Sequence, residues 1–273
     1  MNLLGGRTLI AIAVLLVGGL AAFLLLRDSE QTIDPDTAAR MARNAGDELE
    51  SSTVDVSIAI SLISPDPVGP QTFSARGTVD FQRGAAALTY DFEELINAGG
   101  AFGHLDEFEV IFDGDLVYIR VFEGDKPWVS FRPPELAGRD TERLREVVLA
   151  SPLVVPDYLR GVRDLTGVEK GATTVIGGTV VPSILTGPQS DSTVQLQKLL
   201  KGLEAEVVSV TAELREGTAT RVTHEFPFPI AAGAEEDVLA RVVIDIEPSE
   251  GAEIVAPGDA ETRRFKSLFD RTP

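Results

Sequence analysis

The chain has 273 residues, of which 44% are hydrophobic and 25% are charged, and this length and composition suit one large globular domain or two small ones. Its 43 Asp and Glu residues outnumber its 24 Lys and Arg residues, and the formal charge of −19 argues against nucleic acid or an anionic lipid surface as a partner of the body. The absence of cysteine excludes disulfides, thiolate metal sites, thiol nucleophiles and a lipid-modified N-terminal Cys, and two histidines are too few for a histidine-based metal cluster.

The N-terminal region contains an uncharged apolar run, Thr8–Leu26. As a helix its 19 residues would measure about 28 Å, which matches the hydrocarbon thickness of a bilayer. Arg7 precedes the run and acidic residues follow Arg27, so the N-terminus is expected in the cytoplasm and the body outside it. A cleaved signal peptide is the alternative, but the small residues lie within the apolar run rather than after it. We therefore predict that residues 1–30 form an uncleaved single-pass membrane anchor with a short cytoplasmic end.

The first element of the body is predicted to be a helix that ends near Glu50. Asp34-Pro35-Asp36 combines a capping residue, a proline suited to the first turn and an acid near the positive end of the helix dipole. One face of the helix is apolar and is expected to pack against the rest of the body. Its residues are Ala38, Met41, Ala42, Ala45 and Leu49.

Strands are predicted to follow, because the period of the apolar residues changes from helical to two. Val54, Val56, Ile58, Ile60 and Leu62 share one side of the first strand. Tight turns are expected at Arg83-Gly84 and at Asp113-Gly114, which is a strong hairpin signal. The predicted strands are 53–62, 73–81, 85–92, 107–113, 115–122 and 128–131.

The second part of the chain is predicted to alternate helices with further strands. The predicted helices are Arg139–Ala150, Leu153–Leu165 and Ser192–Leu203. The predicted strands are Val168–Gly171 and Gly178–Leu185 on either side of Gly177-Gly178, followed by Glu204–Arg215, Thr218–Phe226 and Asp237–Glu247. Strands in two consecutive runs with helices between them indicate an α+β fold on a large antiparallel sheet. We assign this domain to residues 31–250 and a polar tail, with a short helix at Glu261–Phe269, to residues 251–273.

The sequence contains no recognisable catalytic motif. The nucleophile elbow, the phosphate-binding loop and the dinucleotide fingerprint are absent, and neither His104 nor His224 lies in a catalytic motif. Acidic pairs such as Asp113 and Asp115 lack the spacing of a calcium loop and are better explained as solvated turn residues. We therefore expect a non-enzymatic protein without a metal or cofactor; hydrolysis at an acidic site is the remote alternative.

The chain contains three motifs, within residues 76–90, 113–128 and 168–179, that in this order resemble the LppX/LprG lipoprotein family of actinobacteria. Residues 76–81 with 87–90 (RGTVDF and ALTY) are similar to one hairpin of that family. Residues 113–120 (DGDLVYIR) with Trp128 are similar to another, and residues 168–171 (VEKG) with 177–179 (GGT) to a third. The order and spacing fit over residues 36–250.

The resemblance implies a LolA-like fold, a strongly curved antiparallel sheet or half-open barrel with helices covering its concave face. It also implies a non-catalytic protein that holds lipids or lipidated glycoconjugates between sheet and helices and transfers them within the cell envelope. The residues expected to line that site are Val56, Ile58, Phe73, Val79, Leu88, Tyr90, Phe112 and Tyr118 from the sheet, and Leu153, Val154, Tyr158 and Leu159 from the cover.

Two departures from the family affect this interpretation. The lipobox cysteine is missing, so a protein helix would replace the lipid anchor. Thr179-Val180-Val181-Pro182 also lacks an aromatic residue that is frequent there, which leaves the size of the site and its ligand open. A filled core would favour the alternative, an extracytoplasmic sensor or scaffold domain that binds a protein partner through its acidic surface.

Overall fold

The computed structural model describes residues 31–63, 71–91, 107–114, 116–121, 128–131, 151–181, 185, 207–228, 238–251, 253–258 and 261–262. Within these ranges no helix is long and apolar enough to cross a membrane. The predicted membrane helix at 8–26 and the predicted helices at 139–150 and 192–203 lie outside them.

Thirteen strands form one sheet, and the described helical segments are two α-helices and one short 3-10 helix. The helical segments are α2 (Pro35–Glu50), η2 (Pro152–Val154) and α5 (Val155–Gly161). The strands of the N-terminal part are β1 (Gln31–Ile33), β2 (Thr53–Ile63), β3 (Gln71–Asp80), β4 (Ala85–Asp91), β5 (Glu107–Asp113), β6 (Leu116–Val121) and β7 (Val129–Phe131). Those of the C-terminal part are β8 (Arg163–Lys170), β9 (Thr173–Val180), β10 (Val208–Arg215), β11 (Thr218–Phe228), β12 (Val238–Pro248) and β13 (Glu261–Thr262).

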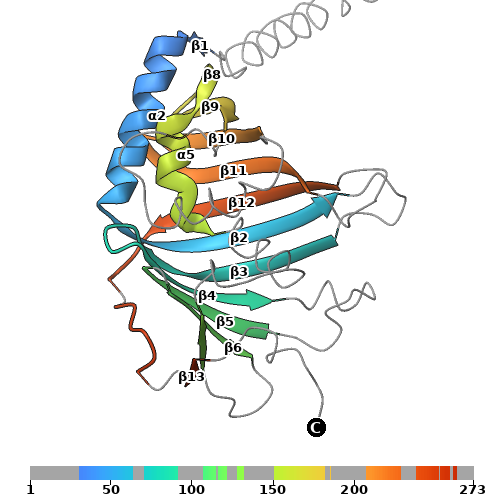
Figure 1. Cartoon of the computed structure of the whole chain (residues 1–273). Helices are drawn as coiled ribbons and strands as arrows, with labels where there is room; N and C mark the ends of the chain where they lie inside the picture. The colour runs from blue at the N-terminus through green and yellow to red at the C-terminus, as the bar shows by residue number, and fades with distance from the viewer. Residues whose placement is uncertain are drawn as a thin grey trace, which may run out of the picture.

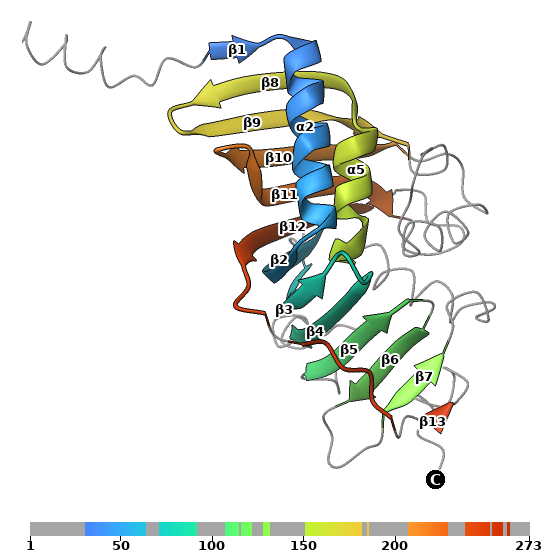
Figure 2. The same ribbon diagram turned by 90° about the vertical axis from the view of Figure 1, so that its left-hand side faces the viewer.

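The sheet has a linear strand order, β1-β8-β9-β10-β11-β12-β2-β3-β4-β5-β6-β7-β13, and is therefore open rather than closed into a barrel. All neighbouring strands are antiparallel except β13, which pairs in parallel with β7. The sheet twists along its length, and α2 and α5 lie side by side across the half that runs from β8 to β2 (Figures 1 and 2). The predicted α+β architecture on a large antiparallel sheet is confirmed.

Helix α2 starts where the sequence signals predict. The Asp34 side chain accepts a hydrogen bond of 3.0 Å from the Thr37 N–H, and hydrogen bonding by Thr37 lowers the pKa of the Asp34 carboxyl. The helix ends with the Ser51 and Ser52 hydroxyls donating to the carbonyls of Glu48 and Leu49. The predicted apolar face is buried, at Ala38, Ala42, Ala45 and Leu49.

Two glycines within strands mark places where the backbone of a neighbouring strand comes very close. A Cβ on Gly77 would lie 1.9 Å from the Ala87 carbonyl oxygen, and a Cβ on Gly178 would lie 2.4 Å from that of Arg163. Only glycine fits such positions. The prediction that Gly177-Gly178 separates two strands is therefore wrong, since both residues lie inside β9 and the turn before it is at Gly171.

Two further predictions of element type are corrected by the pairing of strands. The helix predicted over Leu153–Leu165 ends at Gly161, because Arg163 already pairs with Thr179 in the β8–β9 ladder. The helix predicted over Glu261–Phe269 is contradicted at its start, where Glu261 and Thr262 form β13 and pair with Val129 and Ser130. In both places the structure is decided by strand pairing with a distant segment, which the local spacing of apolar residues does not predict.

Candidate functional site

The candidate site is the side of the sheet that the helices cover, which we call the inner face. Cross-strand partners point to the same side of a sheet, so the register defines this face. For example, Ile58 pairs with Ala75 on one side and Ile244 on the other, and Ala75 pairs with Tyr90. From β10 to β7 it includes Val208, Val210, Ala212, Leu214, Ala219, Val222, His224, Phe226, Ala240, Val242, Ile244, Ile246, Val54, Val56, Ile58, Ile60, Leu62, Phe73, Ala75, Gly77, Val79, Ala86, Leu88, Tyr90, Phe108, Val110, Phe112, Val117, Ile119 and Val129.

This set contains no carboxylate, ammonium or guanidinium group. His224, Tyr90 and the glycine apart, every member carries an aliphatic or phenyl side chain. The charged residues of the same strands lie on the opposite, outer face, where Arg221 pairs with Asp245 at 2.5 Å and Arg241 with Glu225 at 2.5 Å. The inner face is thus a continuous hydrocarbon surface that can hold apolar groups and offers little to a polar metabolite.

Seven of the eight sheet residues predicted for the site lie together on the inner face. Six of them are buried, and Phe73 is partly buried against the same core. They are Val56, Ile58, Phe73, Val79, Leu88, Tyr90 and Phe112. The stacked rings of Tyr90 and Phe108, with centroids 4.9 Å apart, form an aromatic patch on the β4–β5 part of the face.

Tyr118 is the exception, and its assignment to the lining is corrected. It pairs with Ile111 and Ser130, and all three lie on the outer face, while its neighbours Val117 and Ile119 point inward. Both sides of β6 carry apolar residues, so alternation alone does not choose between them. Tyr118 is nevertheless buried, with 9% of its surface exposed.

The four residues predicted for the cover are all buried between η2, α5 and the sheet. Leu153 and Val154 belong to η2, which contacts β4, and Tyr158 and Leu159 belong to α5, which contacts β10. The Tyr158 ring meets the His224 ring edge to face, with centroids 5.6 Å apart. The structure therefore brings the predicted cover onto the inner face, and it adds His224 to the residues beneath it.

His224 is the main residue of this face that the sequence interpretation missed. It is fully buried, lies between Val222 and Phe226 on β11, and stacks on Phe226 at 6.1 Å. The signal was present in the sequence, because His224 alternates in phase with these two apolar residues. A lone histidine on an apolar strand face is weak evidence for function, however, and we assigned it none from the sequence.

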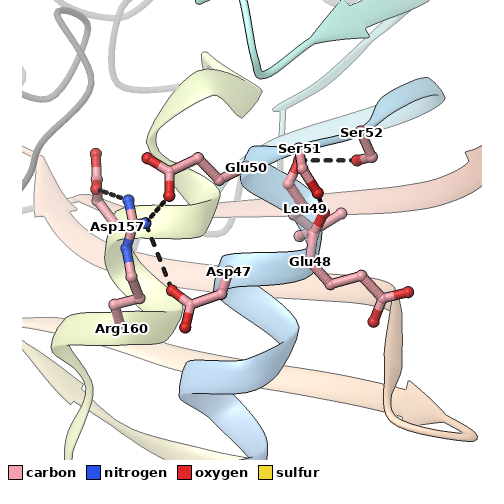
Figure 3. Close-up of polar contacts among 8 residues, drawn as sticks. All are labelled: Asp47, Glu48, Leu49, Glu50, Ser51, Ser52, Asp157 and Arg160. Atoms are coloured by element: carbon pink, nitrogen blue, oxygen red, sulfur yellow. Dashed lines mark hydrogen bonds and ion pairs between the residues drawn. The ribbon is translucent and has the colours of Figure 1, made fainter.

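The helices of the cover are joined to each other by a close contact and a cluster of charges (Figure 3). A Cβ on Gly46 would lie 2.8 Å from the Pro156 carbonyl oxygen, so α2 and α5 touch at that point. The Arg160 guanidinium donates to Asp157 at 2.5 Å and to Glu50, and lies 3.6 Å from Asp47. Burial disfavours the charge of Arg160, but its hydrogen bonds to Glu50 and Asp157 outweigh that effect and raise its pKa. The two helices therefore behave as one covering unit.

The two phenols of the site are uncharged at neutral pH. Burial raises the pKa of Tyr90, and burial together with the nearby Asp157 raises the pKa of Tyr158. Among the described residues, no three His, Asp or Glu side chains are grouped so as to hold a metal ion. Chemically, the described residues of the inner face present a neutral, buried hydrocarbon surface beneath a pair of helices.

No protein-family model and no curated protein matches the chain. Several solved structures do match. The Mycobacterium tuberculosis lipoprotein LppX is 14% identical with a TM-score of 0.42, over 78% of this chain and 95% of its own. LprF from Mycobacterium bovis is 13% identical with a TM-score of 0.43, over 85% of this chain and 100% of its own. A LolA superfamily protein from Nitrosomonas europaea is 7% identical with a TM-score of 0.36, over 79% of this chain and 94% of its own. The chain, which contains no cysteine, is thus similar in structure to LppX, LprF and a LolA superfamily protein.

Proposed function

We propose that this protein binds the acyl chains of lipids or glycolipids on the inner face of its sheet and transfers them within the cell envelope, without catalysis. The observation that carries the proposal is the extent of the inner face. It stays hydrocarbon from β10 to β7, whereas α2 and α5 make their main sheet contacts with β8, β10 and β11. Figure 2 shows both helices over the upper half of the sheet, while β3 to β7 extend beyond them.

The energetics of such a surface favour hydrocarbon ligands. Burying one methylene group is worth about 0.8 kcal/mol, so a long acyl chain can supply the affinity without any polar contact. A charged ligand would lose its hydration and find no described counter-charge on this face. Leu88 and Val110 are buried in the chain, so a lipid reaches this part of the inner face only when the segments that bury these residues move aside.

The test is a binding titration with a pair of matched variants on β5. Val110→Phe enlarges a side chain on the inner face, and Ile111→Phe makes a comparable change on the outer face. With a fluorescent diacyl phospholipid as the probe, Val110→Phe is expected to weaken binding at least several-fold and Ile111→Phe to leave it unchanged. Thermal unfolding of both variants controls for misfolding. Equal affinity in the folded wild type and both variants would contradict the site.

A second part of the proposal concerns location. We propose that residues 1–30 anchor the protein in the cell membrane with its N-terminus in the cytoplasm, as the apolar run Thr8–Leu26 and its flanking charges indicate. β1 begins only five residues after Leu26, so the β1–β8 edge would lie close to the membrane. The full chain should resist alkaline extraction from membranes, and its body should be digested by protease in spheroplasts. Release by alkali, or protection from protease, would contradict this topology.

Lipids are the ligands that this proposal requires, and a membrane transporter or another envelope protein is the partner that would receive or supply them. The alternative of a sensor or scaffold predicts a different result in the same preparations. Crosslinking would then capture a stoichiometric protein partner, and the phospholipid titration would show no saturable binding.

A further inference from the structure

The segment that follows β12 crosses the sheet from its centre to its edge. Its described parts are residues 249–251, residues 253–258 and β13, and we call them together the C-terminal strap. Figures 1 and 2 show the strap leaving β12 and running past β4, β5 and β6 toward β13. The sequence pattern predicted only a polar tail in this region.

The start of the strap is fastened to the central strands β2 and β3. The Asp55 carboxylate of β2 accepts a hydrogen bond of 2.7 Å from the Thr78 hydroxyl of β3 and one of 3.0 Å from the Ser249 hydroxyl. The Gly251 N–H donates to the Ser249 oxygen at 3.3 Å, and Gly251 has a φ of +90°, which favours glycine. The chain therefore turns away from β12 at a defined place.

Ile254 is the buried point of the strap. Only 5% of its surface is exposed, whereas Val255 beside it is 65% exposed. The Ile254 carbonyl accepts a hydrogen bond of 3.1 Å from the guanidinium of Arg83, which lies in the turn between β3 and β4. Arg83 also lies 4.0 Å from Asp113 at the end of β5, and its N–H donates to Asp80 at the end of β3. One arginine thus joins the strap to two hairpin turns.

The far end of the strap is a weak latch on β7. Glu261 and Thr262 of β13 pair with Val129 and Ser130 of β7. The ladder is two residues long, and it is the one parallel pairing among the described strands. Short ladders at the edge of a sheet open at a lower free energy than long central ones, so this end of the strap is suited to release.

We propose that the C-terminal strap holds the β4–β7 part of the sheet closed, and that its release lets acyl chains reach the inner face there. This part carries Leu88 and Val110, both buried, whereas α2 and α5 make their main sheet contacts with β8, β10 and β11. The strap links the β3–β4 turn, the β5 end and β7 to the central strands by a second route, besides the ladders. For its ligand, the inference rests on the proposed function.

The lengths of the strands explain why this part of the sheet needs a fastening. β2 and β12 at the centre have 11 residues each, whereas β5, β6 and β7 have 7, 6 and 3. Short strands near the end of an open sheet separate first when a protein opens locally. A strap that crosses them is therefore placed where it has the largest effect on opening.

Hydrogen exchange tests the fastening without any lipid. Ile254→Asp places a charge at the buried point of the strap, and Val255→Asp places the same charge at the exposed position beside it. Ile254→Asp is expected to speed amide exchange in β5, β6 and β7 by about tenfold or more and to leave β10 and β11 as in wild type. Val255→Asp should match wild type in all of these strands. Arg83→Ala, which removes the bond to the Ile254 carbonyl, is expected to act in the same direction and serves if Ile254→Asp does not fold.

A locked strap tests the effect on lipid exchange. Because the chain has no cysteine, Ser130→Cys combined with Thr262→Cys can form only one disulfide, between β7 and β13. Paired residues of neighbouring strands have Cα atoms about 5 Å apart, which suits a disulfide. The quantity measured is the rate at which a pyrene-labelled phosphatidylcholine leaves the full chain for phosphatidylcholine vesicles. The oxidised double variant should release the probe several-fold more slowly than the same variant in dithiothreitol, and Ile254→Asp should release it faster than wild type and Val255→Asp.

The two measurements separate the strap from the proposed lipid binding. Exchange that is unchanged in a folded strap variant, or that rises equally in β10 and β11, would overturn the proposal. Equal release from the oxidised and reduced forms would overturn it too, and failure of the disulfide to form would show that β13 does not latch onto β7. A chain that binds no phospholipid but still exchanges faster in β5, β6 and β7 would refute the proposed function alone.

Discussion

Two phenols on the inner face show how burial fixes the state of single residues. The phenol groups of Tyr90 and Tyr158 are buried away from water while the fold is intact. Burial raises the pKa of both above that of a phenol in water. In the unfolded chain they ionise near pH 10. The stability that they contribute is therefore complete below about pH 10 and is lost as the pH rises above it, by about 1.4 kcal/mol per pH unit for each phenol.

An alkaline titration followed by tyrosinate absorbance tests this expectation. The chain has three tyrosines, and all of them should titrate in denaturant. The native protein is expected to lack the signals of Tyr90 and Tyr158 until it unfolds, with circular dichroism reporting the fold. Full amplitude near pH 10 in a protein that is still folded would show that these rings are accessible to water.

At this scale the sequence predicted which face of the sheet most of these residues occupy, and it failed where alternation is ambiguous. Between Val54 and Leu62 the large aliphatic residues alternate with aspartate, serine and alanine, so the inward side of β2 was unambiguous. β6 alternates Leu116 and Tyr118 with Val117 and Ile119, and both pairs are apolar. Only the register with β5, a contact between separate segments, places Tyr118 on the outer face.

The contact between α2 and α5 determines whether the cover acts as one unit, and Gly46 lies at its closest point. Replacing glycine by alanine inside a helix normally stabilises it by about 1 kcal/mol. Here the added carbon would lie 2.8 Å from the Pro156 carbonyl oxygen and 3.0 Å from Arg160 Cγ. We expect Gly46→Ala to destabilise the protein by about 1–2 kcal/mol in denaturant unfolding. Asn44→Ala, on the exposed side of α2, is the control and should be neutral or slightly stabilising; a stabilising Gly46→Ala would mean that the helices are not in close contact.

Arg160 supplies the polar part of the same contact. Arg160→Ala leaves the buried Asp157 carboxylate without its guanidinium partner. It also removes the ion pair that links Glu50 of α2 to α5. The expected loss of unfolding free energy is about 2 kcal/mol. Arg241→Ala removes an ion pair with Glu225 that is largely exposed, and should cost less than about 1 kcal/mol. Similar losses in the two variants would show that Arg160 does not join the helices.

Local spacing predicted the type of most elements but not those that depend on distant partners. The cap at Asp34 and the turn at Asp113-Gly114 are local signals, and α2 and the β5–β6 hairpin follow them. β8 begins at Arg163, inside an apolar cluster with helical spacing, because β9 supplies a ladder for it. β1 and β13 are too short to produce any periodic signal and exist through pairing with β8 and β7.

For the whole molecule, as far as the structure describes it, an open twisted sheet carries α2 and α5 on one half, and its hydrocarbon face extends past these two helices. The open strand order leaves β1 and β13 as short edges, which limits pairing with other chains. The charged ladders on the outer face keep that side in water, while the inner face excludes charge. The proposed binding of apolar ligands depends on these features together.

The most direct test of the account is native mass spectrometry of the full chain, purified from membranes in mild detergent. We expect a population whose mass exceeds that of the polypeptide by that of a lipid, and organic extraction should release the lipid and leave a folded protein. Val110→Phe should lower the occupied fraction, whereas Ile111→Phe should not. A polypeptide free of added mass in repeated preparations, together with no uptake of diacyl phospholipid afterwards, would contradict the claim that the inner face holds acyl chains.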